Sequence, residues 1–240
     1  MQQDEREKKY KGANIIFMVV HYEYECTRVT LLNILAIIDE MPDTYLVLIN
    51  SNASLKIKAL VESIQSNKVD VVNLPINFGY NHGVNYYIKD FISSKNLPKC
   101  IVSLGSDILF NKKDFELLIE AVENLPKYAT LSLSYDNNKY NPERNVLKSR
   151  WKKGENGKAY AIRHTFCCPV AGGIMAIRGD IVQDHLDFEL FPPKYIPKVF
   201  QRVVAVGGAD SALYKAIRWK FRVGYLAETR ALHMKSRTGD

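Results

Sequence analysis

The sequence predicts an α/β protein with a mostly parallel sheet, because short apolar runs alternate with segments of helical periodicity. The run from 14 to 20 is almost continuously apolar and rich in β-branched residues, as in strands buried on both faces of a sheet. From 27 to 38, apolar residues recur at helical spacing and predict the first crossover helix. The same strand–helix unit then repeats, so flanking helices are expected on the sheet.

The remaining elements follow the same two periodicities. Further strands are predicted at 45–49, 69–74, 100–104, 131–133, 174–177 and 221–226, and further helices at 55–64, 84–92, 115–122 and 211–219. The polar stretch from 135 to 157 is rich in Asn, Lys, Glu and Gly, and it is predicted to be a long loop or lid. An aromatic and proline-rich loop is predicted from 186 to 200.

Length and composition indicate one globular domain. The 240 residues are 47% hydrophobic, which is enough to bury a sizeable core, and we expect a single domain over 1–240 with halves at 1–128 and 129–240. Basic residues outnumber acidic ones by 33 to 26 and give a formal charge of +7. Such an excess favours polyanionic partners, among them nucleic acid, nucleotide phosphates and anionic membranes.

The cysteines and the first residues indicate a cytoplasmic protein. The four cysteines, at 26, 100, 167 and 168, have no CxxC spacing, and reduced thiols in the cytosol are the simplest interpretation. The segment 1–11 is polar and charged and has no apolar core of a signal peptide. The apolar runs elsewhere are too short to span a bilayer, so any membrane contact is expected to be peripheral.

The common glycine-rich phosphate-binding motifs are absent. Neither GxGxxG nor GxxxxGK[ST] occurs, so the classes that hold phosphates on such a turn lose their main support. In parallel sheets the ligand lies beyond the carboxyl ends of the strands. The segments to inspect there are 21–27, 50–54, 75–85 and 105–110. They offer Asn, Ser, Asp and His side chains instead of a glycine-rich cradle.

Five short motifs occur in a recognisable order at the predicted strand ends. They are Asn77-Phe78-Gly79 with Asn85, Ser106-Asp107, Gly172-Gly173, Ala209-Asp210 and His233. Together they resemble the family 2 glycosyltransferases of the GT-A type, over a span from about residue 14 to about 233. The resemblance implies a Rossmann-like GT-A sheet whose first half binds a nucleotide sugar and whose second half adds an acceptor-side small sheet and loops.

The resemblance places a divalent metal, Mn²⁺ or Mg²⁺, at Asp107 and His233. Asp107 stands where the family carries the last carboxylate of its Asp-x-Asp motif, and Gly105 replaces the first acid of that motif. A hard cation takes carboxylate and phosphate oxygens, and a neutral imidazole suits Mn²⁺ better than Mg²⁺. The alternatives are a solvated turn aspartate and a surface or packed histidine.

Asp210 is the candidate catalytic base. It opens a predicted helix, and the resemblance makes it the group that takes the proton of the acceptor hydroxyl. A helix N-terminus favours the ionised carboxylate that a base requires. Aspartate is also a favoured helix N-cap, so capping alone is an equally simple role. Ala209 replaces the first acid of the usual pair.

Donor and acceptor residues are expected on opposite halves of the chain. The predicted donor-binding set is His21, Tyr22, Ser51, Asn77, Gly79, Asn85, Ser106 and Asp107. The amides in this set are equally suited to helix capping, and the family commonly has an aspartate at the position of Ser51. The predicted acceptor-binding set is Gly172, Gly173, Trp151 and Trp219, with further aromatic residues at Phe188, Phe191 and Tyr195, because sugars stack on aromatic rings.

The resulting hypothesis is an inverting, metal-dependent glycosyltransferase of surface glycan or polysaccharide synthesis. Its partners would be a nucleotide-sugar donor and a hydroxyl acceptor on a glycan, a lipid-linked precursor or a protein. One alternative is a sugar-nucleotide nucleotidyltransferase, although the segment from 21 to 28 lacks the glycine-rich loop typical of that class. The other is a non-catalytic basic nucleic-acid-binding module, which only the charge supports, so no nucleic acid is expected.

Overall fold

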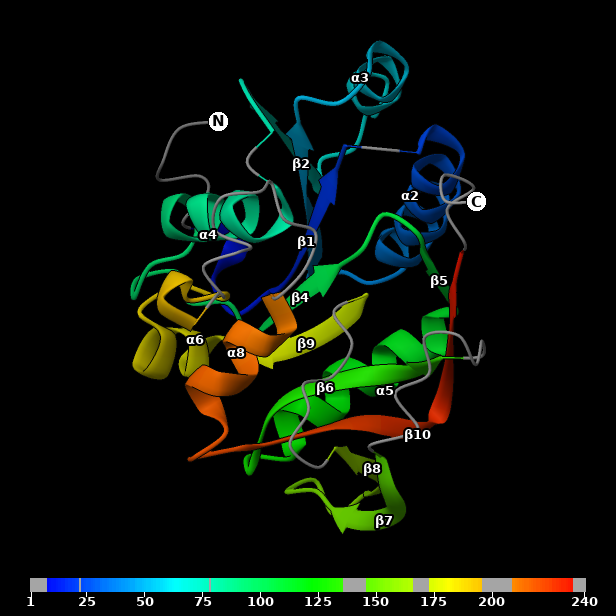
Figure 1. Ribbon diagram of the computed structural model, residues 1–240. Helices are drawn as coiled ribbons and strands as arrows, with labels where there is room; N and C mark the ends of the chain where they lie inside the picture. The colour runs from blue at the N-terminus through cyan, green and yellow to red at the C-terminus, as the bar shows by residue number, and fades with distance from the viewer. Residues whose placement is uncertain are drawn as a thin grey trace.

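The computed structural model describes residues 8–21, 23–77, 79–135, 146–165, 173–195 and 209–234. Within these residues the strands form one ten-stranded sheet in the order β3-β2-β1-β4-β9-β6-β10-β8-β7, and the short strand β5 pairs with β10 beside that path. Helices cover both faces of this sheet (Figure 1). The predicted α/β class is therefore confirmed.

The first half of the chain follows the predicted alternation. Its elements are β1 (Asn14–Val20), α2 (Tyr24–Asp39), β2 (Thr44–Ser51), α3 (Leu55–Glu62), β3 (Val69–Leu74), α4 (Gly79–Phe91) and β4 (Cys100–Leu104). Every side chain of β4, and all but the first of β1, is buried, which explains why these strands read as continuous apolar runs. Helix α4 begins at Gly79, five residues before the predicted start and two residues after Asn77.

The second half contains more strands than predicted. Its elements are β5 (Ile108–Phe110), α5 (Lys112–Asn124), β6 (Tyr128–Tyr135), β7 (Val146–Lys153), β8 (Ala159–Thr165), β9 (Ile174–Arg178), α6 (Gly179–Leu186), the 3₁₀ helix η2 (Pro193–Tyr195), α8 (Ala209–Ile217) and β10 (Arg222–His233). The last strand was predicted to end at 226 but runs on to His233.

The prediction of a loop or lid over 135–157 is wrong for 146–153, whereas 154–157 form the turn between two strands. Strand β7 occupies Val146–Lys153 and pairs antiparallel with β8. Strand β7 is the outermost strand of the sheet, so its polar side chains stay in contact with solvent and give no apolar alternation to detect. Backbone hydrogen bonds to β8 hold this strand, and a hydropathy pattern does not report them.

The sheet is parallel in its first half and mixed in its second. Strands β3, β2, β1 and β4 pair in parallel, whereas β9 lies antiparallel between β4 and β6. Strand β10 runs parallel to β6 and antiparallel to β8 and β5. The β7–β8 hairpin therefore extends the main sheet at the position where the sequence suggested a smaller sheet.

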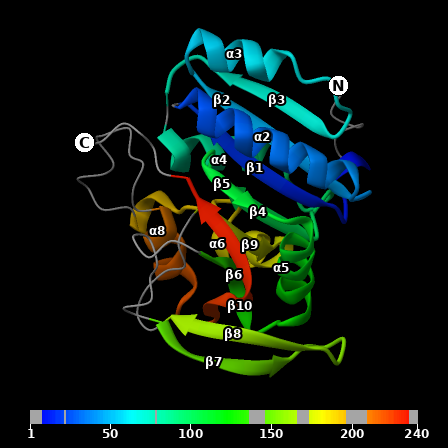
Figure 2. The same cartoon turned by 90° about the vertical axis from the view of Figure 1, so that its right-hand side faces the viewer.

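Helices α4, α6 and α8 lie on one face of the sheet, and α2 and α5 lie on the other (Figures 1 and 2). Helix α4 packs on β1 and β2, α5 packs on β6 and β9, and α6 contacts both β9 and α8. Among the described helices, none combines the length and the apolar character needed to cross a lipid bilayer. The thiols of Cys26 and Cys100 are free, whereas Cys167 and Cys168 lie outside the described residues.

Gly173 directly precedes β9 and lies against residues of β5 and β6. A Cβ atom built on Gly173 would lie 2.7 Å from the hydroxyl of Tyr135 and 2.7 Å from Cδ1 of Ile108. The carbonyl of Gly173 also accepts a hydrogen bond of 2.7 Å from the amide of Gly105. This glycine therefore has a packing role, whatever it contributes to an acceptor site.

We predict that Gly173→Ala lowers the free energy of unfolding by about 1–3 kcal/mol, because Tyr135 or Ile108 must move to admit the methyl group. The matched control is Gly83→Ala in α4, where the nearest atom to a built Cβ is 3.6 Å away. That variant should be about 0.5–1 kcal/mol more stable, since alanine favours a helix interior. Urea unfolding of both proteins checks this, and equal effects would contradict the packing role.

Candidate active site

The carboxyl ends of β1, β2, β3 and β4 point to one rim of the sheet, because these four strands are parallel. His21 follows β1, Ser51 ends β2, Asn77 follows β3, and the turn that contains Ser106 and Asp107 follows β4. Ligands of parallel α/β sheets bind at this rim. Five of the predicted donor-side residues are therefore on the expected side of the sheet.

Asp107 and His233 are brought together by the pairing of β5 with β10. Ile108 is the register partner of His233, and the amide of Met234 donates a hydrogen bond of 2.8 Å to the carbonyl of Asp107. As a result, Nε2 of His233 lies 3.5 Å from Oδ2 of Asp107. The two residues that the motif order singled out as metal ligands are thus neighbours.

The carboxylate of Asp107 is in a partly desolvated position. Burial raises its pKa, the nearby His233 lowers it in part, and the charge of Glu23 raises it further. Burial outweighs the favourable charge, so the ionised carboxylate is held at a cost in the absence of a cation. A cation bound between Asp107 and His233 would offset that cost.

The Asp107–His233 pair fits one edge of a divalent-metal site. Two ligand atoms about 2.1 Å from an octahedral ion lie roughly 3 Å apart when they occupy adjacent positions. The observed 3.5 Å is close to that value and requires only a small side-chain adjustment. Among the described residues there is no group of three or more His, Cys, Asp or Glu side chains that could hold a metal. The described residues would therefore supply two ligands to the ion, Asp107 and His233.

Asp210 lies in the first turn of α8, and Ala212, Leu213 and Ile217 of the same helix are buried. The apolar face of α8 packs inward and fixes the helix, which leaves Asp210 at its N-terminal end. Asp210 is also one of the charges that act on Tyr80 and on Tyr135, two phenols on which Asp107 acts as well. Asp107 and Asp210 thus lie in the same electrostatic neighbourhood although they are far apart in the sequence.

Tyr80 and Tyr135 are site residues that sequence reasoning did not identify. Burial is the main cause that raises the pKa of both phenols above the ordinary value for tyrosine, and the charges of Asp210 and Asp107 add to this. The hydroxyl of Tyr80 is hydrogen-bonded to the Ser103 side chain, and the Tyr135 hydroxyl accepts from the amide of Ile174 at 2.9 Å. Both phenols therefore stay protonated at neutral pH and serve as fixed polar groups.

The sequence carried a weak signal for each of these tyrosines. Tyr80 directly follows the Asn-x-Gly segment, and Tyr135 ends β6, a strand whose predicted end at 133 was two residues too early. The ring of Tyr135 lies 6.4 Å from the ring of His233, so the end of β6 borders the Asp107–His233 pair.

A hydrogen-bonded chain joins the ends of β1, β2 and β3. Nδ1 of His21 donates to the carbonyl of Ser51 at 2.6 Å, and the hydroxyl of Ser51 donates to Oδ1 of Asn77 at 3.1 Å. The same oxygen of Asn77 accepts from the amide of Gly79 at 2.8 Å, as an N-terminal helix cap does. Asn77 thus connects two strand ends and the start of α4, and fixes the rim at the ends of β2 and β3.

The side chain of Asn85 is hydrogen-bonded to the segment that precedes η2. Its side chain donates to the carbonyl of Phe191 at 2.8 Å and accepts from the amide of Phe191 at 2.9 Å, and the residue is only 8% exposed. Both of these bonds fix the segment before η2. The observed role of Asn85 is therefore to anchor this segment to α4. Tyr22 and Gly172 lie outside the described residues.

The predicted acceptor tryptophans lie at a distance from the Asp107–His233 pair. Trp151 is on the outermost strand β7, two strands beyond β10 in the sheet order. Trp219 follows the end of α8, whereas Asp210 lies at the beginning of that helix. The length of α8, about 13 Å, therefore separates the two residues. Phe191 is buried and Phe188 and Tyr195 are partly buried, in or beside the segment that Asn85 anchors.

No protein-family model and no curated protein matches the chain. Solved structures do match. The mannosyltransferase PcManGT from Pyrobaculum calidifontis, in complex with GDP-Man and Mn²⁺, is 12% identical with a TM-score of 0.64, over 99% of this chain and 64% of that one. GalNAc-T7 with UDP, GalNAc and Mn²⁺ is 11% identical with a TM-score of 0.64, over 95% of this chain and 44% of that one.

TarS 1–349 from S. aureus, in complex with UDP-GlcNAc, is 16% identical with a TM-score of 0.61, over 95% of this chain and 60% of that one. The chain therefore spans less than two thirds of the length of each of these proteins. Identities this low establish similarity of fold alone. The chain has the GT-A fold, as the motif order predicted.

Proposed function

We propose that this chain is a metal-dependent glycosyltransferase that moves a sugar from a nucleoside-diphosphate donor to a hydroxyl acceptor. The observation that carries the proposal is the Asp107–His233 pair, with 3.5 Å between Oδ2 and Nε2, at the rim of a GT-A sheet. The pair combines an oxygen and a nitrogen ligand, which is a donor set suited to Mn²⁺.

The similar structures support the same class of donor. They were solved with GDP-Man, with UDP and GalNAc, or with UDP-GlcNAc, and two of the three contain Mn²⁺. The nucleobase and the sugar differ among them. We therefore infer a nucleoside-diphosphate sugar as the donor class and leave the base and the sugar to experiment.

Asp107 and His233 are the residues that would hold the metal. When bound, a divalent cation supplies positive charge that stabilises the negative charge developing on the departing diphosphate. Around it, the hydrogen-bonded chain of His21, Ser51 and Asn77 fixes the strand ends on the donor side. The protonated phenols of Tyr80 and Tyr135 add uncharged polar groups within the electrostatic range of Asp107 and Asp210.

Asp210 is proposed as the general base. Its carboxylate lies in the first turn of α8, where the helix dipole favours the ionised form. It would accept the proton of the acceptor hydroxyl while the oxygen attacks the anomeric carbon and the bond to the diphosphate breaks. One direct displacement inverts the anomeric centre. A precursor of a surface glycan or polysaccharide, glycosylated in the cytoplasm, is the acceptor that we propose.

The test is a panel of nucleotide sugars with Mn²⁺, in which the released nucleotide is identified. A glycosyltransferase releases a nucleoside diphosphate, with slow hydrolysis in the absence of acceptor, whereas a nucleotidyltransferase consumes added pyrophosphate and releases a nucleoside triphosphate with a sugar 1-phosphate. Asp210→Asn should lower turnover about 10²–10⁴-fold and leave donor binding largely intact. Asp184→Asn, at an exposed aspartate of the neighbouring helix α6, is the matched control. Undiminished turnover in Asp210→Asn would remove Asp210 from the mechanism.

A second prediction concerns the stability of the metal-free protein. The folded protein raises the pKa of Asp107, so its ionised form destabilises the fold, and this loss grows as pH rises from the unfolded to the folded pKa. At pH 8 with a chelator, Asp107→Asn should therefore leave Tm unchanged or raise it by up to about 3 °C. The same variant should lose the rise in Tm that Mn²⁺ with a nucleoside diphosphate gives the wild type. A lower Tm without metal, or an unchanged response to Mn²⁺, would contradict the assignment.

A further inference from the structure

Both tryptophans of the chain are exposed, and each stands between an arginine and a lysine. The two segments are Arg150-Trp151-Lys152 and Arg218-Trp219-Lys220. Trp151 is 64% exposed and Trp219 is 83% exposed. Tryptophan is on average a highly buried residue, so two such rings at the surface of one domain call for a partner.

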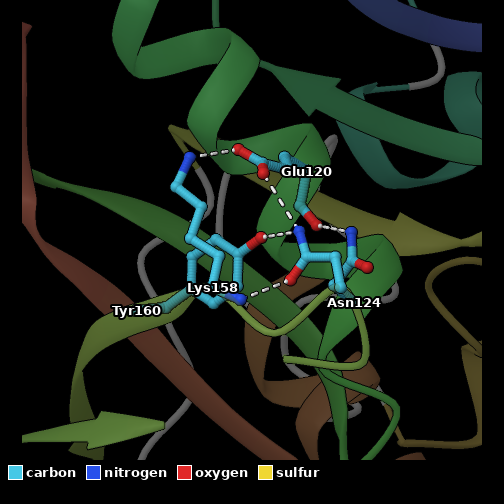
Figure 3. A network of polar contacts seen from close by, with 5 residues as sticks. Glu120, Asn124, Lys158 and Tyr160 are labelled. Atoms are coloured by element: carbon cyan, nitrogen blue, oxygen red, sulfur yellow. Dashed lines mark hydrogen bonds and ion pairs between the residues drawn. The ribbon is translucent and has the colours of Figure 1, made fainter. Parts of the chain in front are cut away.

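Trp151 and the turn that carries Trp219 lie on the same side of the sheet. Lys152 pairs with Tyr160, whose ring lies next to the α5 side chain Glu120 in a polar network with Asn124 and Lys158 (Figure 3). Successive residues of a strand point to opposite faces, so the neighbouring Trp151 points to the face that carries α8. Trp219 directly follows α8 in the turn that leads into β10.

Both segments also lie at the same end of the molecule. Strand β10 begins at Arg222, and its first residues pair with β8, which in turn pairs with β7. In Figure 1 the start of β10 and the β7–β8 hairpin form the lower end, away from β3 and α3. We call this end, made by residues 146–165 and 218–222, the tryptophan edge.

The tryptophan edge carries the excess positive charge of the chain. Its two segments contain nine lysine and arginine residues and a single acid, Glu155, for a net charge of +8, whereas the whole chain carries +7. Lys158 is paired with Glu120 at 2.6 Å. Burial is the main cause that lowers the pKa of His164, and the positive charges of Lys152, Arg222 and Arg150 lower it further. Three cations of the edge therefore act on one imidazole.

Exposed indoles flanked by cations suit the surface of an anionic bilayer. Indole rings are amphipathic and favour the headgroup region, while arginine and lysine attract anionic lipids and reach them with their long side chains. Single-stranded nucleic acid also stacks on aromatic rings, but it binds along a groove that such rings line. Neither tryptophan lines any of three cavities in the described part of the chain, which have volumes of about 650, 310 and 320 Å³.

We propose that the tryptophan edge binds the surface of an anionic lipid bilayer, with both indoles at the level of the headgroups. The Asp107–His233 pair lies elsewhere, because His233 ends the strand that Arg222 begins. The membrane contact is therefore separate from the site proposed for sugar transfer, and it does not depend on that function.

The test is binding of the full chain to vesicles of phosphatidylcholine with about 30% phosphatidylglycerol, beside vesicles of phosphatidylcholine alone, in about 0.1 M salt as the reference condition. Because the chain has only 2 tryptophans, both of them at the edge, its fluorescence reports the contact directly. Binding to the anionic vesicles should shift the emission to shorter wavelength, and the affinity should fall steeply with added salt. Trp151→Ser with Trp219→Ser should weaken cosedimentation with these vesicles by about 10-fold or more.

The matched control is Leu55→Ser with Lys56→Ser on α3, since Leu55 is 84% exposed and lies in the first turn of a helix away from the edge. The control should bind the vesicles like the wild type. A charge variant, Lys153→Glu with Lys220→Glu, should lose binding and keep both indoles. Absence of binding to anionic vesicles, or equal binding by the double serine variant at Trp151 and Trp219, would overturn the proposal. So would quenching of tryptophan fluorescence by a single-stranded oligonucleotide without vesicle binding.

Discussion

The candidate site depends on one antiparallel contact, the pairing of the three-residue strand β5 with the end of β10. Phe110, Leu109 and Ile108 are in register with Ala231, Leu232 and His233, so the turn after β4 meets the last strand. Helix α2 secures β5 from the other side, because the Asn33 side chain bonds both the carbonyl and the amide of Phe110, at 3.0 and 3.3 Å. Without this contact, nothing in the local sequence would keep Asp107 near His233.

Near this contact, burial and a neighbouring charge have opposite effects on the pKa of the Asp107 carboxyl. Burial raises the pKa of Asp107, and it keeps the phenols of Tyr80 and Tyr135 protonated. A carboxylate that is partly desolvated in the metal-free protein has the most to gain from a cation. The same burial that makes the ionised carboxylate of Asp107 costly without a cation therefore favours binding of a metal together with a diphosphate.

Continuous burial made the first half of the fold predictable. Strands β1 and β4 have the predicted bounds because neighbours cover both their faces. Strand β3 is partly exposed, but it also has the predicted bounds because Pro75 ends its apolar run. Strand β5 was expected to be part of a loop, since three residues give no period, and β7 was missed because its polar side chains lie at the outer edge of the sheet. Their existence depends on backbone pairing with partners that are distant in the sequence or themselves weakly patterned.

The same limit applies to the candidate site. The order of short motifs singled out Asp107, Asp210 and His233, but the contact that joins Asp107 to His233 is not encoded in any of those motifs. Asn85 was expected at the donor, yet its amide satisfies the backbone of Phe191, a partner that no local pattern indicates. Conversely, no motif singled out Tyr80 and Tyr135, and only the fold brings them within range of the charges of Asp107 and Asp210.

The claim that Asp107 and His233 hold one cation is tested most directly by pulsed electron paramagnetic resonance of Mn²⁺ bound with a nucleoside diphosphate. A directly coordinated imidazole gives a nitrogen modulation in the Mn²⁺ signal. The wild type should show this modulation, and His233→Gln should lose it while Asp184→Asn retains it. Bound Mn²⁺ with no nitrogen modulation in the wild type, or the same modulation in His233→Gln, would contradict the account.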